Sequence, residues 1–150
     1  MKVTILKDVM ISMNRMQDYF EVVPITLWRA TDTRHPNRHP MDLIEQEYTL
    51  SNGKVRPADI TIKDGWVRVS YAPRGLSVWD KPGVPKGKCW DYFRIPAGTT
   101  LPQGLAVVRD RKNEVYGATH YSLAPAWDME IKSFRMLLRQ LFMEMKKETA

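Results

Sequence analysis

Four short segments of the sequence hold side chains that could do chemistry: residues 27–30, 74–80, 93–99 and 118–125. In the first, Arg29 has a rigid guanidinium fork that suits phosphate oxygens. Ser77 in the second has a hydroxyl, and the fourth joins the imidazole of His120 to the phenol of Tyr121, two side chains that can exchange protons. Each of these residues could instead have an ordinary structural role. Arg29 could form a surface ion pair, Ser77 could be a structural serine in a strand, and His120 could be a core or surface histidine with its hydrogen bonds made.

Better-known catalytic and metal-binding motifs are missing from the sequence. It has no Gly-rich phosphate loop, no Cys–His nucleophile pair and no Gly-x-Ser-x-Gly elbow. His35 and His39 lie four residues apart, but Pro36 stands between them and no Cys or carboxylate pair shares the spacing, so we expect no metal site. The lone Cys89 cannot form an internal disulfide, which fits a reducing compartment.

Short strands must position these segments. Residues 60–63 and 66–69 alternate apolar and polar side chains on either side of Asp64-Gly65, the strongest hairpin signal in the chain. Further short stretches, most of them rich in aromatic or β-branched residues and bounded by Pro, Gly or Asp, predict strands: residues 24–30, 75–79, 92–95, 105–109 and 118–123. The sequence therefore predicts a sheet of several strands.

Three helices are predicted around this sheet. In residues 6–20 apolar side chains recur at spacings of three and four, although residues 2–6 could instead be a short strand. The second helix is short and covers residues 41–48, after a Pro-rich loop. The last covers residues 128–147, with acids at its start, lysines at its end and one apolar face. Packed across one face of the sheet, it gives an α+β layer fold.

The composition is that of one folded domain. At 150 residues, with 43% hydrophobic and 27% charged residues, the chain can bury one core, and we expect a single domain over residues 1–150. Its apolar stretches are far shorter than the roughly 20 residues that cross a bilayer, so no membrane partner is expected. The N-terminus does not have the pattern of a cleaved signal peptide. The net charge of +6 favours anionic partners, such as nucleic acid, cofactor phosphates or an acidic protein.

Three strings in these segments resemble a known family: Gly75-Leu76-Ser77-Val78-Trp79-Asp80, Ile95-Pro96-Ala97-Gly98-Thr99 and Ala118-Thr119-His120-Tyr121. With residues 27–30 ahead of them, the chain is similar to the type VI secretion effector toxins with an ADP-ribosyltransferase-like fold, typified by a Pseudomonas cytotoxin paired with an immunity protein. The similarity spans most of the chain, from Leu27 to the final helix. It implies a split mixed or antiparallel sheet with flanking helices, which grips NAD in a cleft and consumes it as a substrate.

The resemblance also implies roles for individual residues. Arg29 would hold the phosphates or ribose of NAD, and Leu76 and Ser77 would lie against it, with the Ser77 hydroxyl bonded to the nicotinamide ribose. His120, which would also contact NAD, and Tyr121 occupy the last catalytic segment. One of these two would orient the ribose or exchange a proton with the acceptor. No metal is implied.

The sequence departs from the family pattern at one point. Many bacterial transferases that modify proteins carry a Glu on the late strand, which stabilises the positive charge that grows on the ribose as nicotinamide leaves. Residues 118–125 contain no Glu, and Glu114 lies on a turn that we expect to be solvated. Transfer to a protein, a nucleic acid or a small molecule and plain NAD hydrolysis therefore all stay open.

The expected function is an NAD-dependent toxin of the ADP-ribosyltransferase type that arrests the growth of recipient cells. Its partners would be a cognate immunity protein, a component of the secretion apparatus and an unknown macromolecular acceptor, either protein or nucleic acid. It would be cytoplasmic in the producer and delivered to the cytoplasm of a target cell. Two alternatives stay open: a basic nucleic-acid-binding or RNA-processing module with salt-dependent RNA affinity, and a non-enzymatic interaction toxin in which Arg29, Ser77 and His120 could be replaced without cost.

Overall fold

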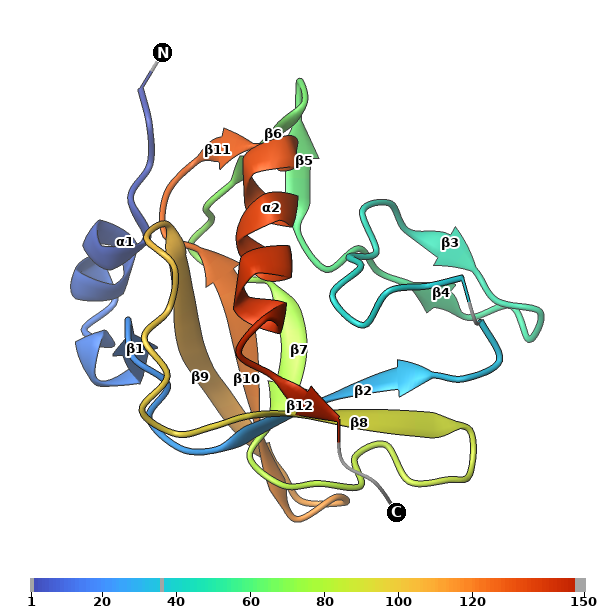
Figure 1. Cartoon of the computed structure of the whole chain (residues 1–150). Helices are drawn as coiled ribbons and strands as arrows, with labels where there is room; N and C mark the ends of the chain where they lie inside the picture. The colour runs from blue at the N-terminus through green and yellow to red at the C-terminus, as the bar shows by residue number, and fades with distance from the viewer. Residues whose placement is uncertain (1, 36, 148–150) are drawn as a thin grey trace.

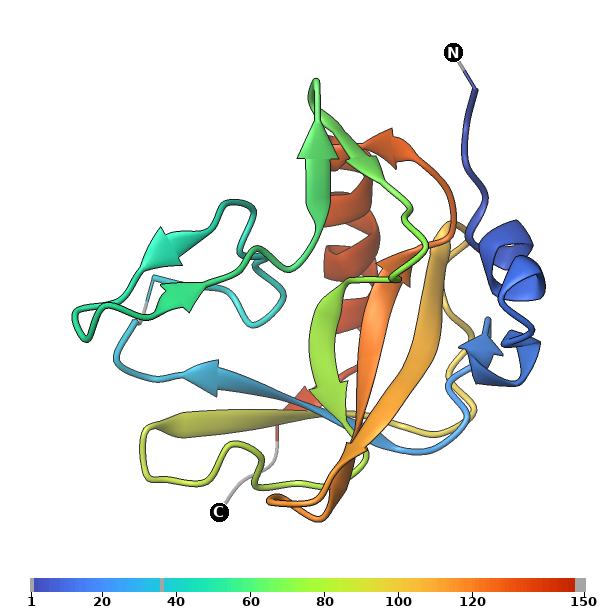
Figure 2. The same cartoon turned by 180° about the vertical axis from the view of Figure 1, so that it is seen from behind.

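An antiparallel sheet lies at the centre of the structure, a computed structural model that describes residues 2–35 and 37–147. Within those residues the sheet has seven strands, and every adjacent pair runs antiparallel. From one edge to the other the strands are β1 (Tyr19–Phe20), β9 (Leu105–Asn113), β10 (Ala118–Pro125), β7 (Leu76–Trp79), β2 (Leu27–Asp32), β8 (Trp90–Ile95) and β12 (Lys146–Lys147). Figures 1 and 2 show this sheet from the front and from behind.

Two helices, α2 (Ile131–Phe142) and α1 (Leu6–Ser12), cover opposite faces of the sheet. Leu123 of β10 belongs to the core cluster that includes the buried side of α2, whereas the next residue, Ala124, belongs to the cluster that includes α1. Successive side chains of a strand point to opposite faces, so β10 is covered on both sides. The predicted α+β fold with flanking helices is confirmed. Neither helix in the described part of the chain is long and apolar enough to cross a membrane.

The predicted hairpin at Asp64 and Gly65 is confirmed. It joins β5 (Thr61–Lys63) to β6 (Trp66–Arg68), and β11 (Met129–Glu130) pairs with the other side of β6. Asp64 and Gly65 have positive φ values of 54° and 77°. A type I′ turn requires positive φ at both central positions, and its twist matches that of the flanking strands.

Residues 41–48 are not helical, contrary to the prediction. They lead irregularly into a separate two-stranded sheet of β3 (Tyr48–Thr49) and β4 (Val55–Arg56), which projects from the main body (Figure 1). The Ile44 N–H donates to Asp59 Oδ2 at 2.7 Å, and the Asp59 N–H donates to the Ile44 carbonyl at 2.7 Å. These long-range hydrogen bonds take up backbone groups that a helix would pair locally.

The first and last helices are shorter than predicted. α1 ends at Ser12, and residue Asn14 has a left-handed φ of 55°, a conformation that ends helices. The rest of the predicted first helix forms η1 (Met16–Asp18) and β1. The final helix begins at Ile131 rather than at Asp128, and Lys146 and Lys147 form the edge strand β12 beside β8 instead of a helix end.

The main sheet splits between β2 and β7. β2 pairs with β8 at six positions, but it pairs with β7 at a single position, Trp28 opposite Trp79. Beyond that pair the two strands diverge, and β2 and β8 run off at an angle to β7, β9 and β10 (Figure 2). The split sheet that the resemblance implies is therefore present.

A buried carboxylate, Asp128, ties the N-terminal segment to the end of β6. Its Oδ2 accepts from the Thr4 N–H at 3.1 Å, its Oδ1 accepts from the Val69 N–H at 2.7 Å, and an Arg68 Nη1 lies 3.5 Å from Oδ2. A charge that is only 5% exposed needs such partners. Asp128 therefore joins two distant segments, and it does not open the helix as its place in the sequence suggests.

We predict that Asp128→Ala lowers the free energy of unfolding by about 3 kcal/mol, because two backbone N–H groups lose their acceptor and a buried ion pair is broken. Urea denaturation of the two chains measures the change. Glu130→Ala is the matched control, since this neighbouring carboxylate is exposed and makes no capping hydrogen bond to α2. Equal effects of the two substitutions would contradict the assigned role of Asp128.

Candidate functional site

Three side chains from three neighbouring strands form one hydrogen-bonded chain. Nε2 of His120, on β10, is 2.9 Å from Ser77 Oγ on β7, and Nδ1 is 2.7 Å from Asp110 Oδ2 on β9. Because a carboxylate only accepts hydrogen bonds, Nδ1 carries the proton that Asp110 accepts, and this leaves Nε2 to accept from the Ser77 hydroxyl. A hydroxyl, an imidazole and an orienting carboxylate in this order can activate the hydroxyl as a nucleophile.

A β-bulge directs Asp110 toward this chain of hydrogen bonds. β10 places His120 opposite Arg111 but places the following residue opposite Arg109, so Asp110 is the extra residue on β9. Oδ2 of Asp110 also accepts from Ser122 Oγ at 2.8 Å. Two donors from β10 therefore hold this carboxylate, and the carboxylate in turn fixes the orientation of the His120 ring.

Ser77 and Trp79 lie between two cavities. One, of about 430 Å³, also contains Asp110 and His120 in its wall, and the other, of about 340 Å³, contains Arg29. The Trp79 ring packs edge-on against the His120 ring, with 4.9 Å between their centroids. Ser77 is only half-buried, so a molecule in either cavity can approach it.

Arg29 spans the opening between β2 and β7. Its Nη1 donates to the Ser77 carbonyl at 3.1 Å and its Nε donates to the Pro40 carbonyl at 2.8 Å. Burial lowers the pKa of Arg29 to about 10, against the opposing effect of the Asp59 carboxylate. The guanidinium therefore stays charged at neutral pH, and it provides a donor where β2 no longer pairs with β7.

The cavity around Arg29 suits an anionic ligand. Arg38 and Arg56 also line it, and their charges further lower the pKa of Arg29. Asp59 neutralises part of this charge, because its Oδ1 lies 3.2 Å from an Arg56 nitrogen. Thr31 belongs to the same wall, and its Oγ1 is buried and has no hydrogen-bond partner among the described residues.

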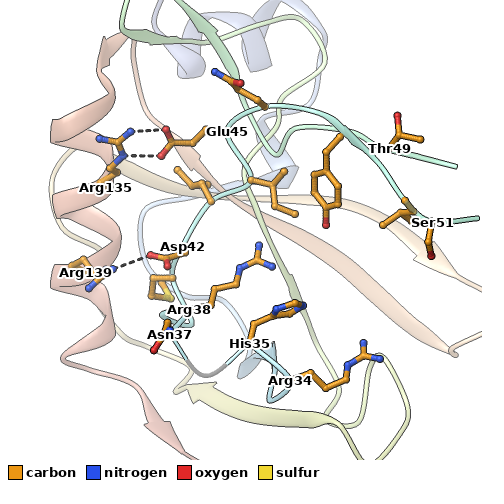
Figure 3. A pocket seen from close by; sticks show the side chains of 16 residues that line it. Arg34, His35, Asn37, Arg38, Asp42, Glu45, Thr49, Ser51, Arg135 and Arg139 are labelled. Carbon is orange, nitrogen blue, oxygen red and sulfur yellow. Dashed lines mark hydrogen bonds and ion pairs between the residues drawn. The ribbon is translucent and has the colours of Figure 1, made fainter. Parts of the chain in front are cut away.

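A larger groove of about 1170 Å³ adjoins this cavity and shares Arg38 with it (Figure 3). α2 forms one wall of the groove. Arg135 Nε donates to Glu45 at 2.7 Å and Arg139 donates to Asp42 at 2.8 Å, as the dashed lines in Figure 3 show. These ion pairs hold the irregular segment against α2 and thereby fix the outer wall of the site.

Of the predicted site residues, the structure brings three together and places two elsewhere. Ser77 is bonded to His120 through its hydroxyl and to Arg29 through its carbonyl. Leu76 is fully buried in the core and lines neither cavity. Tyr121 is 5% exposed and lies in the same core, on the face of β10 opposite His120. Burial raises the pKa of its phenol.

Sequence reasoning does not identify Asp110. It belongs to a charged stretch, residues 109–112, which is typical of a solvated strand end, and the bulge that turns it inward depends on a partner strand. Glu114 is exposed on the turn after β9, as expected, and lines neither cavity. No group of three or more His, Cys, Asp or Glu side chains in residues 2–35 and 37–147 is arranged to hold a metal ion.

Comparison with known proteins gives two matches. Residues 10–150 match the sequence profile of a family described as Tse2 ADP-ribosyltransferase toxin. The chain is also similar to Toxin Tse2 of Pseudomonas aeruginosa, with 44% identity over 61 residues. This second match covers 39% of the chain and 38% of Toxin Tse2, whereas the profile extends over nearly the whole chain and includes the site.

We predict that Arg29→Lys lowers the free energy of unfolding by about 2 kcal/mol, because a single ammonium cannot replace the planar fork that bonds the Ser77 and Pro40 carbonyls. Arg34→Lys is the control, since Arg34 is exposed and its side chain pairs with Asp32, two residues away on the surface. Urea denaturation distinguishes the two. A loss of stability in Arg34→Lys as large as in Arg29→Lys would refute the bridging role.

His39 makes the stability of the chain depend on pH. Its Nδ1 accepts the Met41 N–H at 3.0 Å, which requires an unprotonated Nδ1, and burial, followed by the nearby Arg139, lowers its pKa. The unfolded chain therefore binds more protons than the folded chain as the pH falls below about 7, and the free energy of unfolding decreases. We expect the urea midpoint to fall between about pH 7 and about pH 5.5. It should fall less in His39→Gln, and an identical fall in both chains would rule this cause out.

Proposed function

Because the chain belongs to the Tse2 ADP-ribosyltransferase toxin family, we propose that it is a toxin that takes the ADP-ribose group of NAD at the site of Ser77 and His120. The observation that carries the proposal is the chain of hydrogen bonds from Asp110 through His120 to Ser77. Ser77 lines two cavities, and one of them also contains a cluster of arginines. The hydrogen-bonded chain suits proton transfer at a reacting centre, and the arginines suit the phosphates of a dinucleotide.

The arginine-lined cavity would bind the pyrophosphate of NAD. Arg29 gives one N–H each to the Ser77 and Pro40 carbonyls, and its remaining donors and its charge are available to phosphate oxygens. Trp90, in the same cavity wall, offers an aromatic face to a base or to nicotinamide.

His120 and Asp110 would meet the two chemical demands of the reaction. Cleavage of the bond to nicotinamide leaves positive charge on the ribose, and the acceptor must lose a proton when it attacks. The imidazole takes up that proton, and the carboxylate 2.7 Å from its Nδ1 stabilises the resulting cation. Glu114 is exposed and outside both cavities, so it is not a substitute for the usual late-strand Glu.

Leu76 and Tyr121 would support this site without touching NAD. Both side chains are buried in the main core beneath α2, and they flank Ser77 and His120 along β7 and β10. Their packing holds the two strands in the register that places the Ser77 hydroxyl beside the imidazole. Leu76 and Tyr121 would therefore affect the reaction only through the position of the backbone, and not through contact with NAD.

The cavity of about 430 Å³ would admit the acceptor. With water there, the reaction is NAD hydrolysis, and with a macromolecular group it is ADP-ribosyl transfer. Arg74, Arg111 and Lys112 line this cavity, and they favour an acceptor that carries phosphates, such as a nucleic acid, over a neutral one. A producing cell would then need a cognate immunity protein that blocks the cavities, and a secretion apparatus that delivers the toxin to the cytoplasm of the target cell.

We expect the purified chain to release nicotinamide from NAD, which chromatography of the reaction mixture measures. Ser77→Ala and His120→Ala should lower the rate by roughly 10²-fold or more, since each removes a group at the reacting centre. Glu114→Ala should leave the rate unchanged, because its side chain is exposed and outside both cavities. Expressed in bacteria at matched levels, wild type and Glu114→Ala should arrest growth, while the two site variants should not.

No release of nicotinamide by the wild type, in the presence of water, protein or nucleic acid as acceptor, would refute the proposed reaction. Growth arrest that persists in both site variants would instead favour a toxin that acts by binding. Strongly salt-dependent RNA affinity without loss of NAD would favour the RNA-binding alternative.

A further inference from the structure

The geometry points to Ser77 as a nucleophile that carries the ADP-ribose group covalently between NAD and the acceptor. This inference rests on the proposed function and adds an intermediate to it. Its basis is that the hydroxyl of Ser77 already donates to the imidazole nitrogen of His120 at 2.9 Å, and Asp110 fixes the tautomer in which that nitrogen can take the proton. A nucleophile within hydrogen-bond reach of a base, itself oriented by a third group, is the arrangement of covalent catalysis.

The accessibility of the two serines distinguishes Ser77 from its neighbour. Ser122 lies opposite Ser77 in the sheet and also reaches Asp110, but its hydroxyl donates to the carboxylate and the residue is 3% exposed. Ser77 is half-buried, lines both cavities and bonds the basic nitrogen of the ring. Ser122 also lines the cavity of about 430 Å³, but of the two hydroxyls bound to this network only that of Ser77 bonds the nitrogen that can take its proton.

In the first step, Ser77 Oγ attacks the ribose carbon that carries nicotinamide. The new Oγ–C bond forms as the C–N bond breaks, the electron pair of that bond stays on the nicotinamide nitrogen, and neutral nicotinamide leaves. The hydroxyl proton moves to Nε2 of His120, and the Asp110 carboxylate stabilises the imidazolium. The positive charge of the nicotinamide ring thus ends on His120, so charge is conserved.

In the second step, the acceptor hydroxyl or water attacks the same carbon from the opposite face. The Oγ–C bond breaks and His120 returns its proton to Ser77 Oγ. The freed Nε2 then takes the proton of the acceptor and releases it to solvent. The enzyme is restored, and the net products are nicotinamide, the ADP-ribosylated acceptor and one proton. Two displacements at one anomeric carbon retain its configuration, whereas a single displacement inverts it.

The test uses the purified full chain mixed with NAD in a single turnover and quenched with acid. We expect peptide mass spectrometry to find ADP-ribose on Ser77 in the wild type, and to find none in Ser77→Ala. With methanol as the acceptor, nuclear magnetic resonance should show the methyl glycoside in the β configuration of NAD. Ser122→Ala is the matched control, because it removes the other hydroxyl bonded to Asp110, and it should still form the adduct.

Asp110 acts through His120, so it is a positioning residue. We expect Asp110→Asn to slow adduct formation by roughly 10²-fold or more, because the amide can hold the ring in the wrong tautomer. The pH profile of adduct formation should also change, and Asp110→Glu should restore part of the rate and of the profile. A purely structural role would not alter the pH profile of the adduct.

The outcomes separate this inference from the proposed function. Release of nicotinamide without an adduct on Ser77, together with an α-methyl product, would overturn the covalent intermediate and leave the NAD-dependent reaction standing. No release of nicotinamide at all would remove both.

Discussion

The Arg29 guanidinium bridges a gap that backbone pairing leaves open. β2 and β7 pair at Trp28 and Trp79 and then separate, so the Ser77 carbonyl has no backbone donor from β2. A buried carbonyl without a donor costs on the order of 1–3 kcal/mol, and Arg29 provides that donor while it also bonds the Pro40 carbonyl across the opening. The sheet can therefore split without a large loss of stability, and the split becomes a cavity lined by positive charge.

The second irregularity of the sheet serves the chemistry more directly. Regular pairing of β9 with β10 would alternate residues strictly between the faces, and an extra residue at Asp110 breaks that alternation. The carboxylate thereby reaches both His120 and Ser122, which lie two residues apart on β10. Arg29 and Asp110 therefore lie where regular pairing is interrupted, whereas Ser77 and His120 lie on two strands that pair regularly with each other.

The fold could be predicted where the signals are local. The Asp64-Gly65 turn needs only two residues with positive φ, and the central strands carry their own apolar and β-branched patterns. Residues 41–48 and Asp110 could not be placed in this way, because the first segment is held by Asp59 and by α2, and the second is turned inward by a bulge. Lys146 and Lys147 follow an apolar helical pattern and therefore suggest a helix end. The structure places them in a strand because they pair with β8, which is far away in the sequence.

The missing late-strand Glu has a physical counterpart one strand away. A Glu in contact with the ribose would stabilise developing charge directly, whereas Asp110 lies behind His120 and acts through the ring. The charge of Asp110 can then assist the reaction only when Nε2 of His120 is free to accept a proton. A site in which a Glu contacts the ribose directly has no such requirement. In exchange, the same ring can activate a hydroxyl, and the Ser77 hydroxyl is already bonded to it. The geometry therefore favours a route through Ser77 over simple charge stabilisation. The hydrogen bonds from Ser77 to His120 and from His120 to Asp110 are both aligned to move a proton away from Ser77 Oγ.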